Sequence, residues 1–313
     1  MKDKFINEVH LEGYLYEHKL EKKVTGDTSK NPGTEYIRGS LDIATDDKLL
    51  NIVTVNYTYV TEKTSKGNTN ATFTVLNNIV NGVYKTVMKD GASNATKLRI
   101  DTSIDLNEFY SDKDGKETLV SVKRNDGGFI HVADAINDDE KKRNTFKVDI
   151  VINNVTRKEA DTERNIPEKV IVKGAIFNSF RKNLLPTEFT AVNEAAMSYF
   201  ENLGVTKQEP VFTCIWGRQI SETVVREIRT ESAFGEDEVR EVKNTRKEFI
   251  ITGAAPQPYV WDDPGSITAA ELNEAVQKRE IDLAAMKKRN EEYKASKASP
   301  AARPAIANSE FNF

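Results

Sequence analysis

The sequence predicts a mainly β protein with helices (α+β class), built from two β-rich units, a C-terminal helix and a disordered tail. Three observations predict this. Apolar and polar residues alternate with period two along most of residues 7–252. A spacing of three to four residues, typical of an amphipathic helix, interrupts that alternation once in each half. Beyond residue 266 the chain becomes rich in Ala, Glu, Lys and Arg.

The first unit is expected to span residues 1–137. Strands are predicted at residues 7–18, 36–44, 49–60, 97–106 and 117–123. Gly13 lies on the apolar face of the first strand and indicates a bulge or bend, as where a sheet curls into a barrel. Residues 73–87 have helical spacing, with Asn70 or Thr72 as N-cap and Gly91 beyond the end. Residues 125–128 (Asn-Asp-Gly-Gly) are predicted to form a hairpin turn, with a strand continuing at 129–132.

The charged segment 138–144 marks the expected boundary, and the second unit spans residues 145–262. It repeats the order of elements. Strands are predicted at residues 145–155, 170–177, 184–189, 211–216, 222–230 and 239–252, and a helix at 191–203. A further helix is expected at residues 266–294, where Thr268 and Glu271 have capping-box spacing. Residues 295–313 are predicted to be a disordered tail.

Each unit therefore follows the order strand, strand, strand, helix, strand, strand. Five strands with a helix between the third and the fourth is the order of the OB-fold, a partly open Greek-key barrel. The sequence thus predicts tandem OB-fold-like five-stranded barrels. No residue-level repeat between the two halves accompanies this similarity in element order.

Composition excludes several classes of protein. The net charge of −4 and pI near 5.7 exclude a strongly basic nucleic-acid binder, although a local basic groove stays compatible with them. A single cysteine, Cys214, allows no intrachain disulfide and no thiolate metal site. No phosphate-binding, dinucleotide or nucleophile motif is present, so we expect neither catalysis nor a cofactor or metal. The polar N-terminus, without an apolar signal core, indicates a cytoplasmic protein with no membrane contact.

Aromatic and basic residues at outward strand positions are the candidate binding groups. OB barrels bind single strands by stacking bases on aromatic rings and contacting phosphates with Lys and Arg. The same Tyr residues also suit any exposed strand surface, and the sequence around Trp216 favours a core residue slightly over a stacking platform. The candidates for contact with single-stranded DNA are Tyr14, Tyr16, Tyr36, Arg38, Tyr57, Tyr59, Lys123, Arg124, Phe129, Trp216 and Arg218.

The pattern Asn7-x-Val9-x-Leu11-x-Gly13-x-Leu15 resembles the opening strand of the bacterial and phage single-stranded-DNA-binding protein (SSB) family. The resemblance implies an OB-fold that coats single-stranded DNA in replication, recombination and repair. It also implies a tail whose terminal Phe docks partner enzymes, here Glu310, Phe311 and Phe313. The tail departs from the family pattern, because it has one acidic residue and Asn312 in place of Pro. Other segments resemble uncharacterised phage proteins, which implies a bacteriophage member acting in the host cytoplasm.

The sequence therefore predicts a largely sequence-independent single-stranded DNA-binding protein, with replication or recombination proteins as further partners and a homo-oligomer as an open possibility. The alternative is a structural or assembly protein, virion-associated, whose β units pack against other proteins. Substitution of Tyr57 and Tyr59 separates the two hypotheses, since loss of DNA binding without unfolding favours the first.

Overall fold

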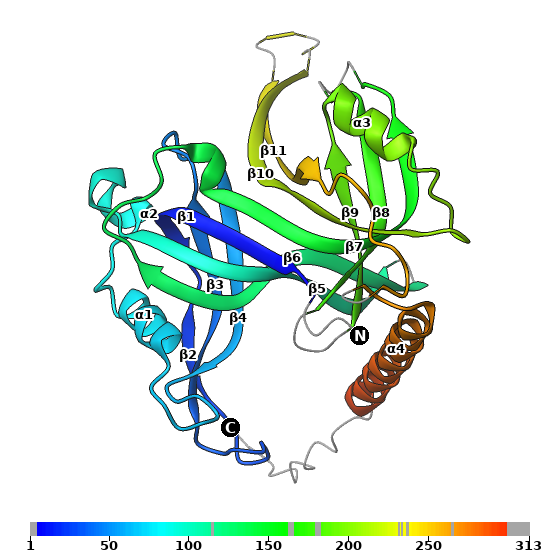
Figure 1. Cartoon of the computed structure of the whole chain (residues 1–313). Coiled ribbons are helices and arrows are strands. Elements are labelled where there is room, and N and C mark those ends of the chain that lie inside the picture. The colour runs from blue at the N-terminus through cyan, green and yellow to red at the C-terminus, as the bar shows by residue number, and fades with distance from the viewer. Residues whose placement is uncertain are drawn as a thin grey trace, which may run out of the picture.

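The computed structural model describes residues 5–113, 116–161, 166–178, 183–230, 232, 234–235, 238–263 and 266–298. Within them, eleven strands join into one sheet that closes into two barrels, one from each half of the chain. Figure 1 shows the two barrels side by side, with β1 and β7 adjacent where they meet. The predicted α+β class, mainly β with a C-terminal helix, is confirmed.

The first barrel has the strand pairing of an OB-fold. Its first strand pairs with the second and the fourth, the third pairs in parallel with the fifth, and the fifth pairs with the fourth. Helix α1 (Ala71–Val80) lies between the third and fourth strands, and the Asn70 side chain caps it, as expected. The five strands are β1 (Asn7–His18), β3 (Glu35–Ala44), β4 (Ile52–Thr61), β5 (Lys97–Lys113) and β6 (Lys116–Val132). The short β2 (Glu21–Val24) pairs in antiparallel fashion with the start of β3.

The second barrel repeats this pairing pattern strand for strand. Helix α3 (Glu194–Glu201) again lies between the third and fourth strands and is capped by the Asn193 side chain. The strands are β7 (Asn144–Lys158), β8 (Lys169–Phe177), β9 (Leu184–Ala191), β10 (Val211–Thr230) and β11 (Glu238–Ala254). Each barrel is closed by an unusual parallel pair of strands, β4 with β6 in the first and β9 with β11 in the second. The two halves of the chain therefore repeat the same strand topology.

Antiparallel pairing of β1 with β7 joins the barrels, and a buried amide cluster fixes the angle between them. Gln219 of β10 and Asn125 of β6 exchange two side-chain hydrogen bonds, each 3.0 Å long. The main-chain oxygen of Gln219 accepts further bonds from the side chains of Asn144 (2.6 Å) and Asn51 (3.2 Å). Because Gln219, Asn125 and Asn144 are almost fully buried, these bonds form away from competing water. The barrels are therefore held as one unit.

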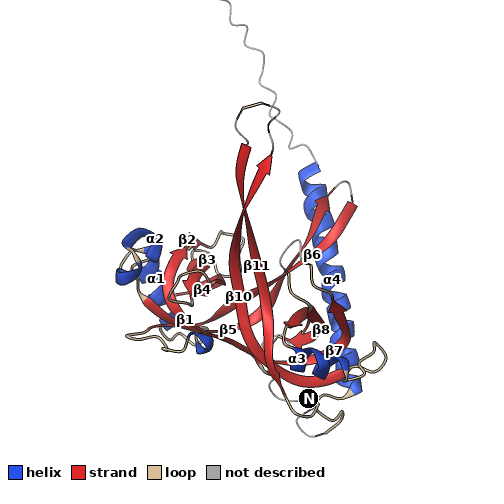
Figure 2. Cartoon of the chain, turned by 90° about the horizontal axis from the view of Figure 1, so that it is seen from above, coloured by secondary structure: helices blue, strands red, loops and turns tan. Residues whose placement is uncertain are grey.

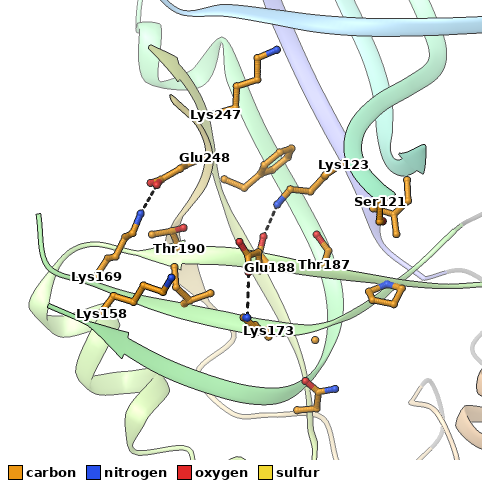
Figure 3. Close-up of a pocket in the computed structure, with 16 residues that line it drawn as sticks. Ser121, Lys123, Lys158, Lys169, Lys173, Thr187, Glu188, Thr190, Lys247 and Glu248 are labelled. Atoms are coloured by element: carbon orange, nitrogen blue, oxygen red, sulfur yellow. Dashed lines mark hydrogen bonds and ion pairs between the residues drawn. The ribbon is translucent and has the colours of Figure 1, made fainter. Parts of the chain in front are cut away.

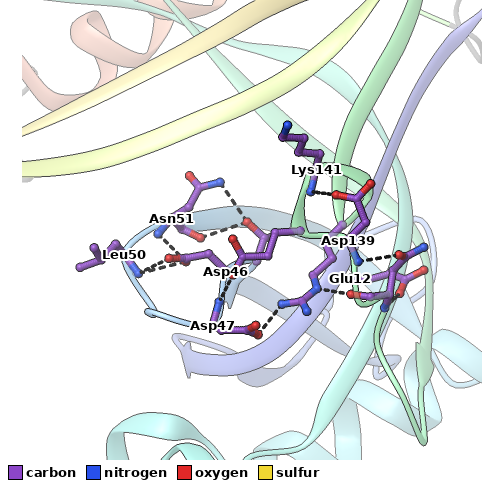
Figure 4. Close-up of polar contacts among 11 residues, drawn as sticks. Glu12, Asp46, Asp47, Leu50, Asn51, Asp139 and Lys141 are labelled. Carbon is purple, nitrogen blue, oxygen red and sulfur yellow. Dashed lines mark hydrogen bonds and ion pairs between the residues drawn. The ribbon is translucent and has the colours of Figure 1, made fainter.

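A second polar cluster holds the connection between the barrels against the first of them (Figure 4). The buried Arg143 guanidinium contacts the Asp47 carboxylate at 2.6 Å and also donates to the Asn137 main-chain oxygen. The Glu12 carboxylate accepts from the Asn137 main-chain N–H at 2.8 Å and from Arg99 at 3.1 Å. The connection, which includes the turn η2 (Glu140–Lys142), is thus anchored in its middle, at Asn137, and at its last residue, Arg143.

One apolar core runs through both barrels, and a smaller cluster covers the outside of the second barrel. The main core joins inward residues of every barrel strand with one face of α1 and of α3. In the smaller cluster, Phe5 stacks on Phe177 at a centroid distance of 3.9 Å, and Ile267 and Ala275 pack beside them. This cluster anchors the start of helix α4 (Ala269–Ala298) to the second barrel.

Two hairpins extend beyond the barrels. The β10–β11 hairpin projects as a two-stranded arm, and α4 lies alongside the β5–β6 hairpin (Figure 2). Arg279 of α4 binds Glu108 of β5 through two nitrogens, at 2.6 and 3.2 Å, and Lys294 contacts Glu117 of β6 at 2.9 Å. Ion pairs therefore hold most of the length of a polar helix. None of the helices in the described ranges is long and apolar enough to cross a bilayer.

Three local predictions are wrong. The helix expected over 73–87 ends after Val80, because the chain turns at Gly82 (φ +72°), and the short α2 (Val87–Asp90) follows. Residues 125–128 form no hairpin turn. They lie within the single strand β6, where Gly127 and Gly128 make a bulge opposite Thr102, between the pairs Asp101–Phe129 and Ser103–Asp126. The strands expected at 211–216 and 222–230 are one continuous strand, β10. The predicted capping box of Thr268 and Glu271 is confirmed at 3.0 and 3.1 Å.

Candidate nucleic-acid interface

A groove lies between the β5–β6 hairpin and the second barrel. It consists of two adjoining cavities of about 650 and 450 Å³ that share Ser121, Lys123, Lys247, Glu248 and Phe249. The larger cavity extends over β8 and β9 of the second barrel, and the smaller one over β4 of the first barrel and β10. Figure 3 shows the larger cavity, with side chains from both sides pointing into it. We call the two cavities together the inter-barrel groove.

Positive charge is concentrated in this groove. Its lining includes six basic side chains and two carboxylates, those of Glu188 and Glu248. Positive groups therefore exceed negative ones by four, whereas the whole chain has a net charge of −4. A concave basic surface of this kind concentrates the electrostatic field and attracts polyanions. The six basic residues are Lys123, Arg124, Lys158, Lys169, Lys173 and Lys247.

The strand register places two of these lysines directly opposite each other. Lys158 of β7 pairs with Lys169 of β8 in the antiparallel ladder, an arrangement that is destabilising unless an anion lies nearby. Glu248 binds Lys169, which compensates one of the two charges. Lys158 and Lys247 are exposed, and neither makes an ion pair with any residue that the structure describes. These two ammonium groups are available to a ligand.

Lys123 has a different environment from the other lysines. Its ammonium lies 4.1 Å from the centre of the Phe249 ring and 4.7 Å from that of Phe189, and it donates to the Glu188 main-chain oxygen. Burial lowers the pKa of Lys123 to about 8, although the carboxylates of Glu188 and Glu248 favour its charged form. The aromatic faces and the carbonyl thus fix one positive charge in the middle of the groove.

Only two of the residues that the sequence suggested, Lys123 and Arg124, line this groove. The prediction that Tyr57 faces outward is wrong. Tyr57 is 2% exposed and follows Val53 and Val55 on the inward face of β4, and burial raises its pKa well above the ordinary value. Tyr59, two residues on, is 49% exposed because Thr58 and Tyr59 form a bulge opposite Arg38 of β3, after which Val60 faces the core instead.

The remaining candidates are spread over other surfaces. Tyr59 contacts Tyr36 on the first barrel, with ring centroids 4.7 Å apart, and Arg38 is paired with Glu21 at 2.7 Å. Tyr14 and Tyr16 are half-buried on β1, and Phe129 is 71% exposed on β6. Trp216 and Arg218 line a separate small cavity on β10. The tail residues Glu310, Phe311 and Phe313 lie outside the described residues.

Sequence reasoning missed Lys158, Lys169, Lys173 and Lys247. Register was the missing information, because Lys158 and Lys169 face each other only when β7 and β8 pair as antiparallel strands in this register. The OB element order, repeated in the second half, was a partial indication that these lysines lie close together. If β7 and β8 are paired as consecutive strands, their charged ends come together.

The strand pairings and the groove define a class of protein: a tandem OB-fold with a basic groove between its barrels. The family model described as YorF matches residues 6–292, so the chain belongs to the YorF family. No curated protein matches the sequence.

Two solved structures of the single-stranded DNA binding protein from Thermus aquaticus are similar to this chain. A deletion mutant is 10% identical, with 83% of this chain and 98% of that chain covered and a TM-score of 0.44. The wild-type protein is 9% identical, with 84% and 98% covered and a TM-score of 0.43. The OB topology of the present chain follows from its own strand pairings.

Proposed function

We propose that this protein binds single-stranded DNA in the inter-barrel groove, largely without sequence preference. The observation that carries the proposal is the excess of positive charge in a groove fixed between two OB barrels, within a chain of net negative charge. Lysines contact phosphates, which every sequence shares, and the groove walls supply apolar contacts from Phe249 and Val122. Its biological role is to protect single strands in replication or recombination, and the tail ending in Phe313 recruits a partner protein.

The test measures the salt dependence of binding. A fluorescein-labelled oligothymidine is titrated with the full chain at several salt concentrations, and binding is followed by fluorescence anisotropy. The double variant Lys158→Gln/Lys247→Gln removes the two unpaired ammonium groups. It should bind more weakly and reduce the slope of log affinity against log salt by about 1.4, since each phosphate contact contributes roughly 0.7 on a single strand.

The matched control is Lys207→Gln/Lys288→Gln, which changes the net charge equally at two exposed lysines outside the groove. It should leave the slope unchanged. Equal effects of the two double variants would mean that DNA binds elsewhere on the protein. Absence of binding by the unmodified protein at low salt, or equal affinity for duplex of the same length, would contradict the proposal and favour an assembly protein.

A further inference from the structure

The side chain of Trp216 is supported on one face by a glycine. Trp216 of β10 lies opposite Gly253 of β11 in the antiparallel ladder. A Cβ at residue 253 would stand 2.4 Å from Trp216 Nε1 and 2.5 Å from Cε2, closer than any real contact. The indole therefore lies directly over the Gly253 backbone, which only glycine permits. The side chain is nevertheless 39% exposed, so part of the ring remains accessible.

A small cavity of about 350 Å³ adjoins the ring. Its lining includes two cations, Lys141 and Arg218, and no carboxylate. Neither cation makes an ion pair with a residue in the described part of the chain. The turn that carries Lys141 is held by the polar cluster around Arg143, and Figure 4 shows the Lys141 side chain pointing away from Asp139. The cavity thus offers one aromatic face and two uncompensated positive charges.

This combination fits a planar group attached to an anion. An exposed indole face binds other π systems by stacking, and ammonium and guanidinium groups neutralise phosphate. A nucleotide supplies both parts. The cavity shares no lining residue with the inter-barrel groove, but Arg218 is followed along β10 by Gln219, Ile220 and Ser221, which line the groove. A strand leaving the groove along β10 would reach Trp216 next.

We propose that Trp216 is a base-stacking platform at the exit of the groove, with Lys141 and Arg218 contacting the phosphates beside the stacked base. The inference rests on the proposed function, since it assigns a second contact point to the same bound strand. Gly253 is a positioning residue, because it sets the height of the indole above the sheet. Stacking needs no base-edge hydrogen bond, so the platform accepts any base.

The test uses the presence of two tryptophans. Trp261 lies in the small apolar cluster, 6.1 Å from the ring centre of Phe212. In the Trp261→Phe variant, Trp216 is the one remaining tryptophan, and saturating oligothymidine should quench its fluorescence strongly. In Trp216→Phe, where Trp261 alone emits, quenching should be lost. Trp216→Ala should weaken anisotropy-detected binding about 5- to 100-fold.

Three further measurements separate the possible failures. Far-UV circular dichroism establishes that each variant is folded. Gly253→Ala should shift the Trp216 emission and weaken binding even though it removes no side chain. If DNA binds with lysine-dependent salt sensitivity while Trp216 is neither quenched nor needed, the platform is overturned and the proposed function stands. If the unmodified protein does not bind oligothymidine at all, both are overturned.

Discussion

Replacing Gln219 with alanine tests whether the buried amide cluster holds the two barrels together. The substitution deletes both side-chain bonds to Asn125 but leaves the main-chain groups of residue 219 in place. Asn125 keeps its 3.1 Å bond to the Thr54 main-chain oxygen, whereas its own side-chain oxygen loses its donor while 97% buried.

The magnitude follows from these contacts. Each lost hydrogen bond contributes about 1 kcal/mol, and an unsatisfied buried acceptor costs about 1–3 kcal/mol more. A small cavity adds to the loss. For two lost bonds and one unsatisfied acceptor, we expect the free energy of unfolding of Gln219→Ala to fall by about 3–5 kcal/mol. Because β6 and β10 form opposite walls of the groove, oligothymidine affinity should fall as well.

The assay is urea unfolding followed by circular dichroism, with Gln208→Ala as control. Gln208 is exposed in a loop, and its substitution should change the free energy of unfolding by less than about 0.5 kcal/mol. If Gln219→Ala behaves like the control, in both stability and DNA affinity, the amide pair does not couple the barrels. The fixed geometry of the groove would then need another cause.

Two other predictions concern the groove and the β6 bulge. Lys123 is positively charged below its pKa of about 8, so oligothymidine affinity should fall between pH 7 and 9, and Lys123→Arg, which stays charged, should flatten that profile. Identical pH profiles would show that Lys123 does not contact the DNA. Gly128→Ala should lower the unfolding free energy by at least about 2 kcal/mol, because φ is +102° and a Cβ would stand 2.2 Å from the Asp101 oxygen. At Gly127 the space is open and φ is +67°, so Gly127→Ala should lower the unfolding free energy by only about 1 kcal/mol. Equal losses of unfolding free energy in the two variants would contradict the argument from close approach.

Alternation and spacing were sufficient to predict the element order of both barrels. Period-two patterns identify strands because one face of each is buried, and Asn70 and Thr268 mark helix starts through their caps. Local patterns failed where tertiary contacts override them. Asn125–Gly128 has the composition of a hairpin turn, but both neighbouring segments pair with the same partner, β5, so the glycines form a bulge instead.

The site was harder to predict than the fold. The alternation of side chains along β4 places Tyr57 on the same face as Val53 and Val55, and the barrel buries it. The polar phenol nevertheless suggested an outward position. The lysines of the groove come from β6, β7, β8 and β11, which are distant in sequence. Only the register of each ladder brings them together, and register depends on long-range pairing that no local pattern specifies.

The groove and the Trp216 platform should leave different signatures in a salt titration. Lysine contacts release counterions, so removing Lys158 and Lys247 changes the slope of log affinity against log salt. Stacking releases no counterions, so Trp216→Ala should lower affinity by the same factor at every salt concentration and leave the slope unchanged. The Lys141→Gln/Arg218→Gln variant should reduce the slope while Trp216 is still quenched at saturation. If Trp216→Ala instead changed the slope, the indole would act by positioning its neighbouring cations, and the base would stack elsewhere.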